Sequence, residues 1–589
     1  MDYLWTAVGD WLAWVVSLML PWLLGWLLLS GADDLVLLGA FLLTSRAAAA
    51  PTARQLESAR RKHIAIFVPC WREDAVIASM LRHNLGASRY RELVFFVGVY
   101  PNDRLTMEAV GAVASEDGRV RMAVCPRPGP TSKADCLNAI HGRMREYEAE
   151  SGLRFELVVV HDAEDLIHPD ELSWLNYYGD SYAMIQLPVL ALPTPWHRMT
   201  HGIYCDDFAQ FHTIELPARC RLGGFLPSAG VGTAYHRAAL ERMAEESETL
   251  FDPGSLTEDY ELGLRLHRMG ARQLFLPICV VDGAPVATRE YFPQRFGAAL
   301  RQRTRWSTGI VWQAWERHGW GTGWERYWFW RDRKGLIGHP VSLLAAGVGA
   351  YAAARWVSGA GEAWPPDSWA AALMPLTALL GGVQVAMRVV SAGRIYGWGF
   401  GALAPLRLLL GHVLNTLSVG KACADYLGGR WSGRAVAWRK TDHHYPGTTA
   451  LAAHRRKVGE ILTGLGYLEE RVLREALESK PDGVMLGRHL VEGGLVTERQ
   501  LYEALSVQAA VPLGQGERAE PAMARTLPLS VIRGRRVVPL CVERGSMIVA
   551  TPEVPDDRIG RELQGWTRLP VRFRLVTPGE FERICEQML

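Results

Sequence analysis

The 589-residue sequence offers little that would place it among disulfide-rich, zinc-binding or nucleic-acid-binding proteins. Its nine cysteines are scattered and include no Cys-x-x-Cys pair, which argues against a disulfide framework or a structural zinc site and fits a reduced cytoplasmic setting. The formal net charge is only +2, so no bulk electrostatic attraction to nucleic acid is expected. The motif Gly-x-x-x-x-Gly-Lys-Ser/Thr is absent, which excludes a P-loop ATPase.

Long apolar runs, by contrast, are present and predict membrane helices. Trp11 to Leu29 is long enough to cross a bilayer, as are Gly335 to Val357 and Trp369 to Val390. The first run has no basic residue before it and no small-residue cleavage site, so we expect an anchor rather than a signal peptide. Leu35 to Leu43 is too short to span and is expected to be interfacial or packed against protein. The 22 tryptophans suit membrane interfaces and sugar-stacking surfaces.

The distribution of basic residues predicts the orientation of these helices. No Lys or Arg precedes the first run, whereas Arg46, Arg54, Arg60, Arg61 and Lys62 follow it. Basic residues also precede the second run, and acidic residues lie in the loop after it. The residues concerned are Arg331, Arg333 and Lys334 before that run and Glu362 and Asp367 in the loop. The positive-inside rule therefore puts the N-terminus outside and the domain that follows the first run in the cytoplasm.

A fourth apolar stretch, Leu406 to Leu417, is interrupted by Arg407, His412 and Asn415. If it crossed the membrane, the C-terminal region would lie outside. We expect instead an interfacial amphipathic helix on the cytoplasmic side.

Short apolar strands alternate with helical patterns in the first half of the chain. The segments His63 to Pro69, Leu93 to Val99, Leu157 to Val160 and Met184 to Leu190 are the predicted strands. This alternation predicts an α/β domain with a doubly wound parallel sheet. Acids follow the first two strands at Asp74 and Asp103, and the carboxyl edge of such a sheet is where ligands bind.

The strand Leu157 to Val160 ends in a cluster of acids at Asp162, Glu164 and Asp165. Two carboxylates one residue apart in a turn can converge on a hard divalent cation, which prefers oxygen ligands. We therefore predict Asp162 and Glu164 as metal ligands. A solvated acidic turn, or an N-cap before the helix at Asp170, is the alternative.

Two later motifs favour the metal site. Leu256-Thr257-Glu258-Asp259 precedes an amphipathic run, and Gln302-Arg303-Thr304-Arg305-Trp306 follows it. Asp-x-Asp-like, Thr-Glu-Asp and Gln-x-x-Arg-Trp motifs in this order, flanked by hydrophobic spans, resemble the processive family 2 glycosyltransferases. Glu164 departs from the usual second Asp by one methylene. The resemblance implies a GT-A-type fold, a UDP-sugar donor and a divalent metal, Mg or Mn.

The resemblance also implies roles for single residues. Asp259, beside Glu258, would be the general base, and the nucleotide diphosphate would leave with inversion of the sugar. Gln302 and Arg305 would hold the diphosphate, and Trp306 would offer a ring face to the acceptor. The donor residues predicted by resemblance are Asp74 or Asp103 for the uridine, Lys133 for the diphosphate, and Asp162.

Plainer interpretations of these residues stay open. Asp74 and Asp103 are also compatible with ordinary polar turns, Lys133 with a lone surface lysine, and Arg305-Trp306 with a membrane-interface pair. The segment from Gly223 to Gly232, with the Tyr235, His236 and Arg237 that follow, would lie near the acceptor by resemblance, although tight turns alone explain its glycines.

The C-terminal region contains a repeat with an offset of 28 residues, so that Gly459 aligns with Gly487 and Gly466 with Gly494. Each copy predicts two short helices joined by a glycine turn. The pattern resembles the cyclic di-GMP-binding N-terminal domain of type II secretion ATPases. The residues assigned to the nucleotide are Lys457, Val458, Gly459, Leu462, Gly466, Leu473, Leu477, Met485, Leu486, Gly487, Leu490, Gly494, Leu501, Leu505 and Gln508.

The consensus of that domain opens each motif with Arg, where this chain has Lys457 and Met485, and an Arg can pair bidentately with a guanine edge. A small helical docking domain is therefore the alternative. Val537 to Ala550 and Val571 to Val576 predict strands and Gly579 starts a helix, which gives an α+β regulatory domain. Between the transferase and this tail, 428–456 is expected to be a linker, in which His443-His444 lacks a second ligand pair and is expected to be solvated.

The combination resembles the bacteriophage adsorption protein B family from about Gly31 to the end. It implies an anchor at 1–45, a glycosyltransferase domain at 46–334, membrane and interfacial helices at 335–427, and a cyclic di-GMP-binding domain at 457–589. We predict a bacterial inner-membrane enzyme, with catalytic and regulatory domains in the cytoplasm, that extends a secreted glycan usable as a phage receptor. An outer-membrane export partner is expected, and nucleic acid is not. A single-transfer lipid-carrier glycosyltransferase and an inactive, cyclic di-GMP-responsive scaffold are the alternatives.

Overall fold

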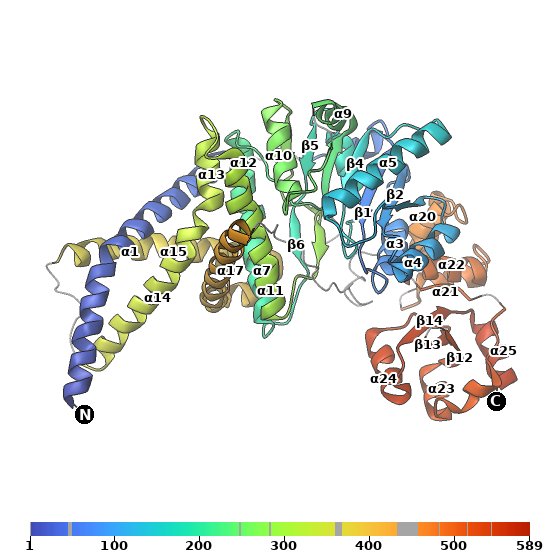
Figure 1. Cartoon of the computed structure of the whole chain (residues 1–589). Coiled ribbons are helices and arrows are strands. Elements are labelled where there is room, and N and C mark those ends of the chain that lie inside the picture. The colour runs from blue at the N-terminus through green and yellow to red at the C-terminus, as the bar shows by residue number, and fades with distance from the viewer. Residues whose placement is uncertain are drawn as a thin grey trace.

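The structure is a computed structural model (Figure 1). It describes residues 2–44, 50–246, 249–281, 284–359, 368–432, 457–481, 483–509, 511–514, 516–543 and 545–588. Apolar helices lie at one end of the molecule, next to the N-terminus, and the small C-terminal sheet lies at the other, with the α/β domain between them.

A seven-stranded sheet in the order β3-β2-β1-β4-β7-β5-β8 forms the centre of the α/β domain. All neighbouring strands are parallel except β7, which is antiparallel to both β4 and β5. The strands are β1 Ile64–Pro69, β2 Leu93–Val99, β3 Val120–Val124, β4 Leu157–Val160, β5 Met184–Gln186, β7 Thr233–His236 and β8 Gln273–Phe275. The predicted α/β sheet is confirmed, but its expected parallel character is wrong at β7. That strand begins beside the end of β4, where Thr233 pairs with Val160, and runs back from that edge.

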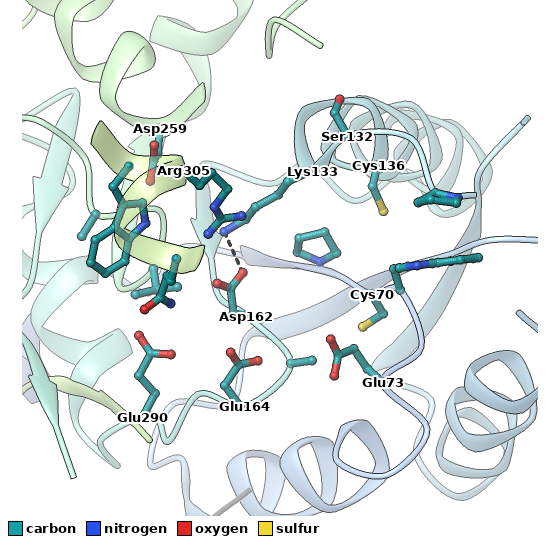
Figure 2. A pocket seen from close by; sticks show the side chains of 18 of the residues that line it. Cys70, Glu73, Ser132, Lys133, Cys136, Asp162, Glu164, Asp259, Glu290 and Arg305 are labelled. Atoms are coloured by element: carbon teal, nitrogen blue, oxygen red, sulfur yellow. Dashed lines mark ion pairs between the residues drawn. The ribbon is translucent and has the colours of Figure 1, made fainter. Parts of the chain in front are cut away.

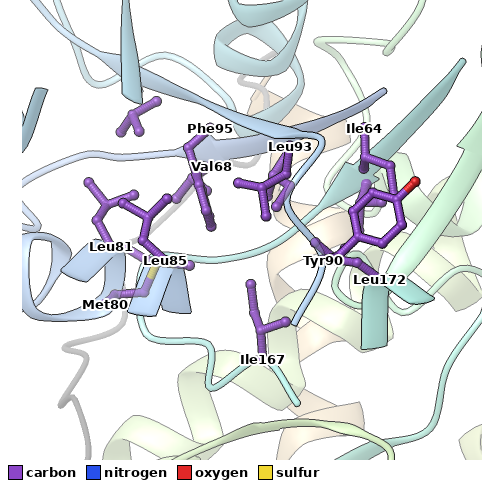
Figure 3. Packing of buried hydrophobic residues seen from close by; sticks show 14 of the residues in the cluster. Ile64, Val68, Met80, Leu81, Leu85, Tyr90, Leu93, Phe95, Ile167 and Leu172 are labelled. Carbon is purple, nitrogen blue, oxygen red and sulfur yellow. The ribbon is translucent and has the colours of Figure 1, made fainter. Parts of the chain in front are cut away.

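Each face of this sheet carries its own core. Along β1, Ile64, Ile66 and Val68 face one core, and Ala65 and Phe67 face the other, as the two-residue period of a strand requires. All five are fully buried, which explains why the strand reads as a continuous apolar run. Figure 3 shows the first core, where α3 packs on the sheet. The covering helices are α3 Ile77–Ala87, α4 Arg104–Glu116, α5 Lys133–Ser151, α6 Glu171–Tyr178, α9 Arg237–Glu246 and α10 Glu258–Arg268.

The predicted strand Met184 to Leu190 is split into two. After β5 the chain leaves the main sheet, and β6 Val189–Ala191 pairs in parallel with β11 Thr288–Glu290. The remaining short elements are α2 Ala53–Ser58, η1 Phe211–Glu215, α8 Leu216–Arg221, β9 Val280–Val281, β10 Ala284–Pro285, η2 Thr308–Gln313, α12 Ala314–His318, α13 Glu325–Arg333 and α16 Trp398–Ala402.

The N-terminal anchor is a single helix, α1 Asp2–Thr44, and Leu35 to Leu43 forms its last turns. Leu37 is buried there against Phe225, Trp328 and Phe329 of the α/β domain. One turn earlier, Asp33 and Asp34 form ion pairs with Lys334 at 2.9 and 2.7 Å. The short apolar run is therefore a packed extension of the anchor, held by charge as well as by apolar contact.

Three helices of the described residues are long and apolar enough to cross a membrane: 13–44 of α1, α14 Gly335–Val357 and α15 Trp369–Tyr396. These match the three predicted runs. The acidic loop with Glu362 and Asp367 lies outside the described residues, so the predicted orientation stays a prediction.

The fourth stretch belongs to α17 Ala404–Ser432, which packs against α7 Met199–Gln210 and α11 Phe296–Ser307. Its Arg407 is fully buried and pairs with Asp206 at 2.7 Å. The opposite face exposes Leu406, Leu409 and Leu417. A helix with one face on protein and one apolar face outward fits the expected interfacial helix.

The tail begins with two helical hairpins, as the repeat predicts. They are α19 Val458–Gly464 with α20 Glu470–Ser479, and α21 Leu486–Glu492 with α22 Glu498–Ala509. The turn glycines Gly466 and Gly494 have φ of 75° and 64°, a backbone region that favours glycine. An α+β unit follows, made of η4 Pro521–Arg525, α23 Leu529–Arg535, β12 Val538–Glu543, β13 Ser546–Thr551, α24 Asp557–Thr567, β14 Val571–Leu575 and α25 Pro578–Met588. The predicted linker starts inside α17, and its residues 433–456, including His443 and His444, lie outside the described residues.

Candidate active site

A pocket opens at the carboxyl ends of β1 and β4, the edge where the sequence placed the acids (Figure 2). Of the predicted residues, it brings together two from the acidic turn, one lysine, the last acid of Thr-Glu-Asp and three from Gln-x-x-Arg-Trp. Those that line it are Lys133, Asp162, Glu164, Asp259, Gln302, Arg305 and Trp306. The three motifs, which are far apart in the sequence, therefore form one site.

The acidic turn is fixed from behind by a buried network. The Asp165 carboxylate accepts a hydrogen bond from the backbone N–H of Asp162 at 3.0 Å and pairs with the His161 ring at 2.9 Å. The other ring nitrogen of His161 lies 3.0 Å from Glu171. Burial alone would lower the pKa of His161, but the two carboxylates raise it to about 9. The charged ring thus holds Asp165 in place, and Asp162 and Glu164 project into the pocket.

Lys133 connects the acidic turn to the predicted base. Its ammonium lies 2.7 Å from the Asp162 carboxylate and donates to the Gly230 carbonyl at 3.3 Å. Burial would lower the pKa of Lys133, but Asp162, Glu258 and Asp259 raise it above the ordinary value, so the lysine stays charged. It begins α5, and the Ser132 side chain caps that helix. The protein therefore holds Lys133 at the pocket as a fixed positive charge, and Lys133 is not a lone surface lysine.

Asp259 stands in the first turn of α10 against the glycine loop. A Cβ on Gly230, whose φ is 75°, would lie 2.5 Å from Asp259 Oδ2. The other carboxylate oxygen accepts from the Tyr260 N–H at 2.8 Å. Burial raises the pKa of Asp259. A carboxylate with a raised pKa, held at a pocket wall, has the character of a general base.

We expect Gly230→Ala to reduce turnover by at least about tenfold, because the new methyl group displaces the Asp259 carboxylate, and small misplacements of reacting groups are costly. Gly223→Ala is the matched control, since its φ of 70° carries the same backbone strain but a Cβ there meets no atom of the described residues within 4 Å. Turnover and thermal unfolding of both variants would be compared. Equal turnover of the two variants would show that the contact with Asp259 is unimportant.

The Gln-x-x-Arg-Trp motif lies on α11 and supplies polar groups that the surrounding protein does not fully satisfy. Among the described residues, nothing donates a hydrogen bond to Gln302 Oε1 or accepts one from Arg305 Nε, although both atoms are buried. Leaving such atoms unsatisfied is costly, so they suit a polar ligand. Trp306 packs beside Tyr204 and Phe208, with ring centroids 6.2 Å apart in each case.

Contacts that the sequence did not reveal join the two motifs. The π-helix η2 follows α11 directly, and a Cβ on its Gly309 would lie 2.5 Å from Thr257 Oγ1. The Leu256 N–H donates to Gln313 Oε1 at 3.0 Å. Such π-helical turns often occur at functional sites. Here the π-helical turn packs against the start of α10 and so fixes it next to the end of α11.

The two acids predicted for the uridine do not line the pocket. Asp74 is exposed, and Asp103 accepts a hydrogen bond from the backbone N–H of Arg72, whose φ is 56°. Asp103 therefore shapes the turn after β1. Glu73 and Tyr100 line the pocket at this position instead. Which of two neighbouring residues after a strand faces the pocket cannot be predicted from the sequence of the strand end.

Glu258 and the glycine-rich segment are two further features that the sequence predicts near the site. Glu258 does not line the pocket, and burial with the neighbouring Asp259 raises its pKa to about 7. In the glycine-rich segment, Ala229 and Val231 line the pocket, whereas Arg237 pairs with Glu148 at 3.0 Å beyond the far end of β7. Glu290, on β11, lines the pocket and was not predicted, because its strand gave no motif.

Asp162 and Glu164 suit a divalent metal. The described residues contain no group of three or more His, Cys, Asp or Glu that could hold an ion. An ion shared with a nucleotide diphosphate needs no such group, since Mg²⁺ typically uses one or two carboxylates together with phosphates and water. A pre-positioned pair of carboxylates beside Lys133 and Arg305, with Asp162 half-buried and Glu164 buried, fits this arrangement.

In the tail, the repeated glycines and leucines form the core of the hairpins. A Cβ on Gly459 would lie 2.8 Å from Leu473, and one on Gly487 would lie 2.8 Å from Leu501, so the offset of 28 is repeated in space. Leu462 and Leu490 are fully buried in the same core. In this conformation they support the fold, and contact with a nucleotide would fall to exposed members of the motif. These include Lys457, Leu477 and Met485.

Comparisons with known proteins agree with this architecture. Residues 61–309 match the family described as glycosyltransferase like family 2, and residues 509–589 match the MshEN domain. The second match begins just after the repeats. Bacteriophage adsorption protein B of Escherichia coli K12 is 34% identical over 558 residues, which cover 90% of this chain and 74% of that protein. Bacteriophage N4 adsorption protein B of Escherichia coli O157:H7 matches to the same extent.

Two solved structures resemble parts of the chain. A mannosyltransferase from Pyrobaculum calidifontis in complex with GDP-Man and Mn²⁺ is 18% identical, covers 65% of this chain and 99% of its own, and has a TM-score of 0.39. A structure of MshE with cdg is 20% identical, covers 23% of this chain and 100% of its own, and has a TM-score of 0.21.

Proposed function

Because the chain belongs to the bacteriophage adsorption protein B family, we propose that it is an inverting, processive inner-membrane glycosyltransferase controlled by cyclic di-GMP. It would transfer a hexosyl or N-acetylhexosaminyl group from a UDP-sugar to a growing secreted glycan. The observation that carries this proposal is the single pocket in which Lys133, Asp162, Asp259 and Arg305 meet. The inner-membrane location rests on the three apolar helices and on the positive-inside rule.

The chemistry is a single displacement at the anomeric carbon. The acceptor hydroxyl gives its proton to Asp259 while its oxygen bonds to the sugar, and the bond from the sugar to the diphosphate breaks. The leaving UDP keeps the electron pair. Lys133 and Arg305 face the charge that develops on the diphosphate, and Gln302 orients it. A divalent ion held by Asp162 and Glu164, when bound, would add positive charge at the same place.

The aromatic wall of the pocket supports a glycan acceptor. Trp306, Phe208 and Phe292 line the pocket and pack together, and Phe208 and Phe292 have ring centroids 4.5 Å apart. Aromatic faces of this kind offer an apolar surface to a sugar ring. The same α11 packs on α17, the helix with the outward apolar face, so the acceptor end of the site lies close to the membrane helices. This closeness supports repeated addition to a chain that is passed to the membrane.

The tail supports control by cyclic di-GMP. Two helical hairpins with aligned glycines are followed by an MshEN domain. We propose domain limits of 46–334 for the transferase and 457–589 for the regulatory part, with activation when the nucleotide binds. The exposed Lys457, Leu477 and Met485 would contact it.

The direct test is turnover by the purified full chain with Mn²⁺ and a panel of radiolabelled UDP-hexoses and UDP-N-acetylhexosamines, with and without cyclic di-GMP. We expect one donor to give a polymer on a sizing gel, and more of it with cyclic di-GMP. A single sugar on a lipid carrier would favour a single-transfer enzyme. No turnover of any donor, with retained cyclic di-GMP binding, would favour a scaffold.

A further inference from the structure

The tail touches the transferase domain at α3, a helix that the proposed chemistry does not use. A Cβ on Gly86 of α3 would lie 2.6 Å from Val507 Cγ1 and 3.1 Å from the Val507 carbonyl oxygen. Val507 lies on α22 and also packs against the leucine core of the hairpins. The tail is therefore seated when Val507 packs against the bare backbone at Gly86. Val507 connects this contact to the leucine core of the repeat.

An ionic contact reinforces the same junction. Arg89, just beyond α3, pairs with Asp170 at 2.6 Å and approaches Glu460 of α19 at 3.6 Å. Its backbone N–H donates to the Pro169 carbonyl at 2.9 Å. Both hairpins of the tail thus reach the catalytic domain, and Arg89 connects the first of them to the loop that follows the acidic turn.

The inward face of α3 holds that loop directly. Asn84 is buried, donates through Nδ2 to the Asp165 carbonyl at 2.9 Å and accepts from the Ile167 N–H at 3.1 Å. Asp165 in turn accepts from the backbone N–H of Asp162. Gly86 and Asn84 are two residues apart on one helix and so face nearly opposite sides. The helix α3 therefore lies between the tail and the acidic turn.

We propose that α3 couples the two ligand sites. Binding of cyclic di-GMP to the repeats changes the packing of Val507 on Gly86, and this change reaches the acidic turn through Asn84 on the same helix. This inference rests on the proposed function. Asn84 is a positioning residue for Asp162 and Glu164. Cyclic di-GMP shifts the equilibrium only to the extent that it binds the seated and unseated arrangements with different affinity. The coupling is reciprocal, so UDP with Mn²⁺ must change the affinity for cyclic di-GMP by the same factor.

Gly86→Ala in the full-length protein tests the coupling. The substitution suits a helix but leaves no room for the seated tail, because the methyl group would meet the Val507 side chain and backbone. Gly142→Ala in α5 is the matched control, since a Cβ there has no neighbour within 4 Å in the part of the chain that the structure describes. The probe is UDP with Mn²⁺, and its affinity is measured by calorimetry with and without saturating cyclic di-GMP.

In the wild type and in Gly142→Ala we expect cyclic di-GMP to change the Kd of UDP by about fivefold or more, within the usual range of allosteric coupling. In Gly86→Ala the ratio should fall to about one, with each ligand still bound when added alone. An unchanged ratio in Gly86→Ala, or a ratio of one in the wild type, would overturn the inference. Loss of coupling with intact UDP binding leaves the proposed transferase standing, whereas absence of UDP binding in the wild type would contradict the proposed function itself.

Asn84→Ala provides a second readout. It should raise the Mn²⁺ concentration needed for half-maximal UDP binding by about fivefold or more, while the Kd of cyclic di-GMP with no UDP present changes less than about twofold. A general loss of structure would weaken both ligands together. An unchanged Mn²⁺ requirement would show that Asn84 does not position the acidic turn.

Discussion

Asp259→Asn is expected to lower the transfer rate by about 10²- to 10⁴-fold, the usual contribution of a positioned general base. The amide keeps the shape of the side chain and its place against Gly230 but cannot take the proton of the acceptor hydroxyl. Binding of UDP with Mn²⁺ should be largely retained, because Lys133, Asp162 and Arg305 are untouched. The measurement is product formation under donor saturation, together with calorimetry of UDP binding.

Glu258→Gln is the matched control for this variant. Glu258 is the neighbouring carboxylate and is buried, but it does not line the pocket. We expect its loss to cost much less turnover than the loss of Asp259. If Asp259→Asn turned over at a near-normal rate, the proton would have to go elsewhere, and a larger effect of Glu258→Gln would point to that residue as the base.

The pH dependence follows from the same carboxylate. Burial raises the pKa of Asp259 above its ordinary value, and only the ionised form can act as a base. Turnover of the wild type should therefore decline as the pH falls, beginning above the usual titration range of an aspartate. A pH–rate profile that stays flat down to that ordinary range would contradict the assignment.

The sequence was most informative where chemistry depends on residue type at the end of an element. Three motifs predict Asp162, Glu164, Asp259 and Arg305 as site residues, and the fold brings all of them into one pocket. The sheet edge explains this for Asp162 and Glu164, which follow the carboxyl end of β4. Asp259 and Arg305 lie on α10 and α11 instead and reach the pocket through the packing of these helices. The hairpins of the tail were predicted equally well, since their leucine spacing and turn glycines are local properties.

Features that depend on which segments meet were not predictable in this way. Asp74 and Glu73 are neighbours after β1, and only the turn held by Asp103 decides that Glu73 faces the pocket. Leu462 had the spacing of a helix face, but whether that face meets a nucleotide or a second hairpin depends on tertiary packing. Gly86 gave no signal at all, because its importance comes from Val507, some 400 residues away in the sequence.

Replacing both acids of the turn, Asp162→Ala with Glu164→Ala, should abolish divalent-dependent turnover, a loss of at least about 100-fold for charge stabilisation worth several kcal/mol. UDP binding should weaken as well and lose its dependence on Mn²⁺. The turn itself should survive, because His161, Asp165 and Glu171 hold it from behind and remain in place. The effect would then be on charge rather than on folding, and an unchanged unfolding temperature would confirm that.

Asp74→Ala serves as the control, since it removes an exposed acid next to the same edge without touching the pocket. Its Mn²⁺ titration should match the wild type within about twofold, as expected of a surface site. Chelation of divalent ions provides an independent check, because it should reproduce the double variant in the unaltered protein. If chelation left wild-type turnover intact, Lys133 and Arg305 would have to neutralise the diphosphate alone. Asp162 would then serve to hold Lys133, 2.7 Å away, in position.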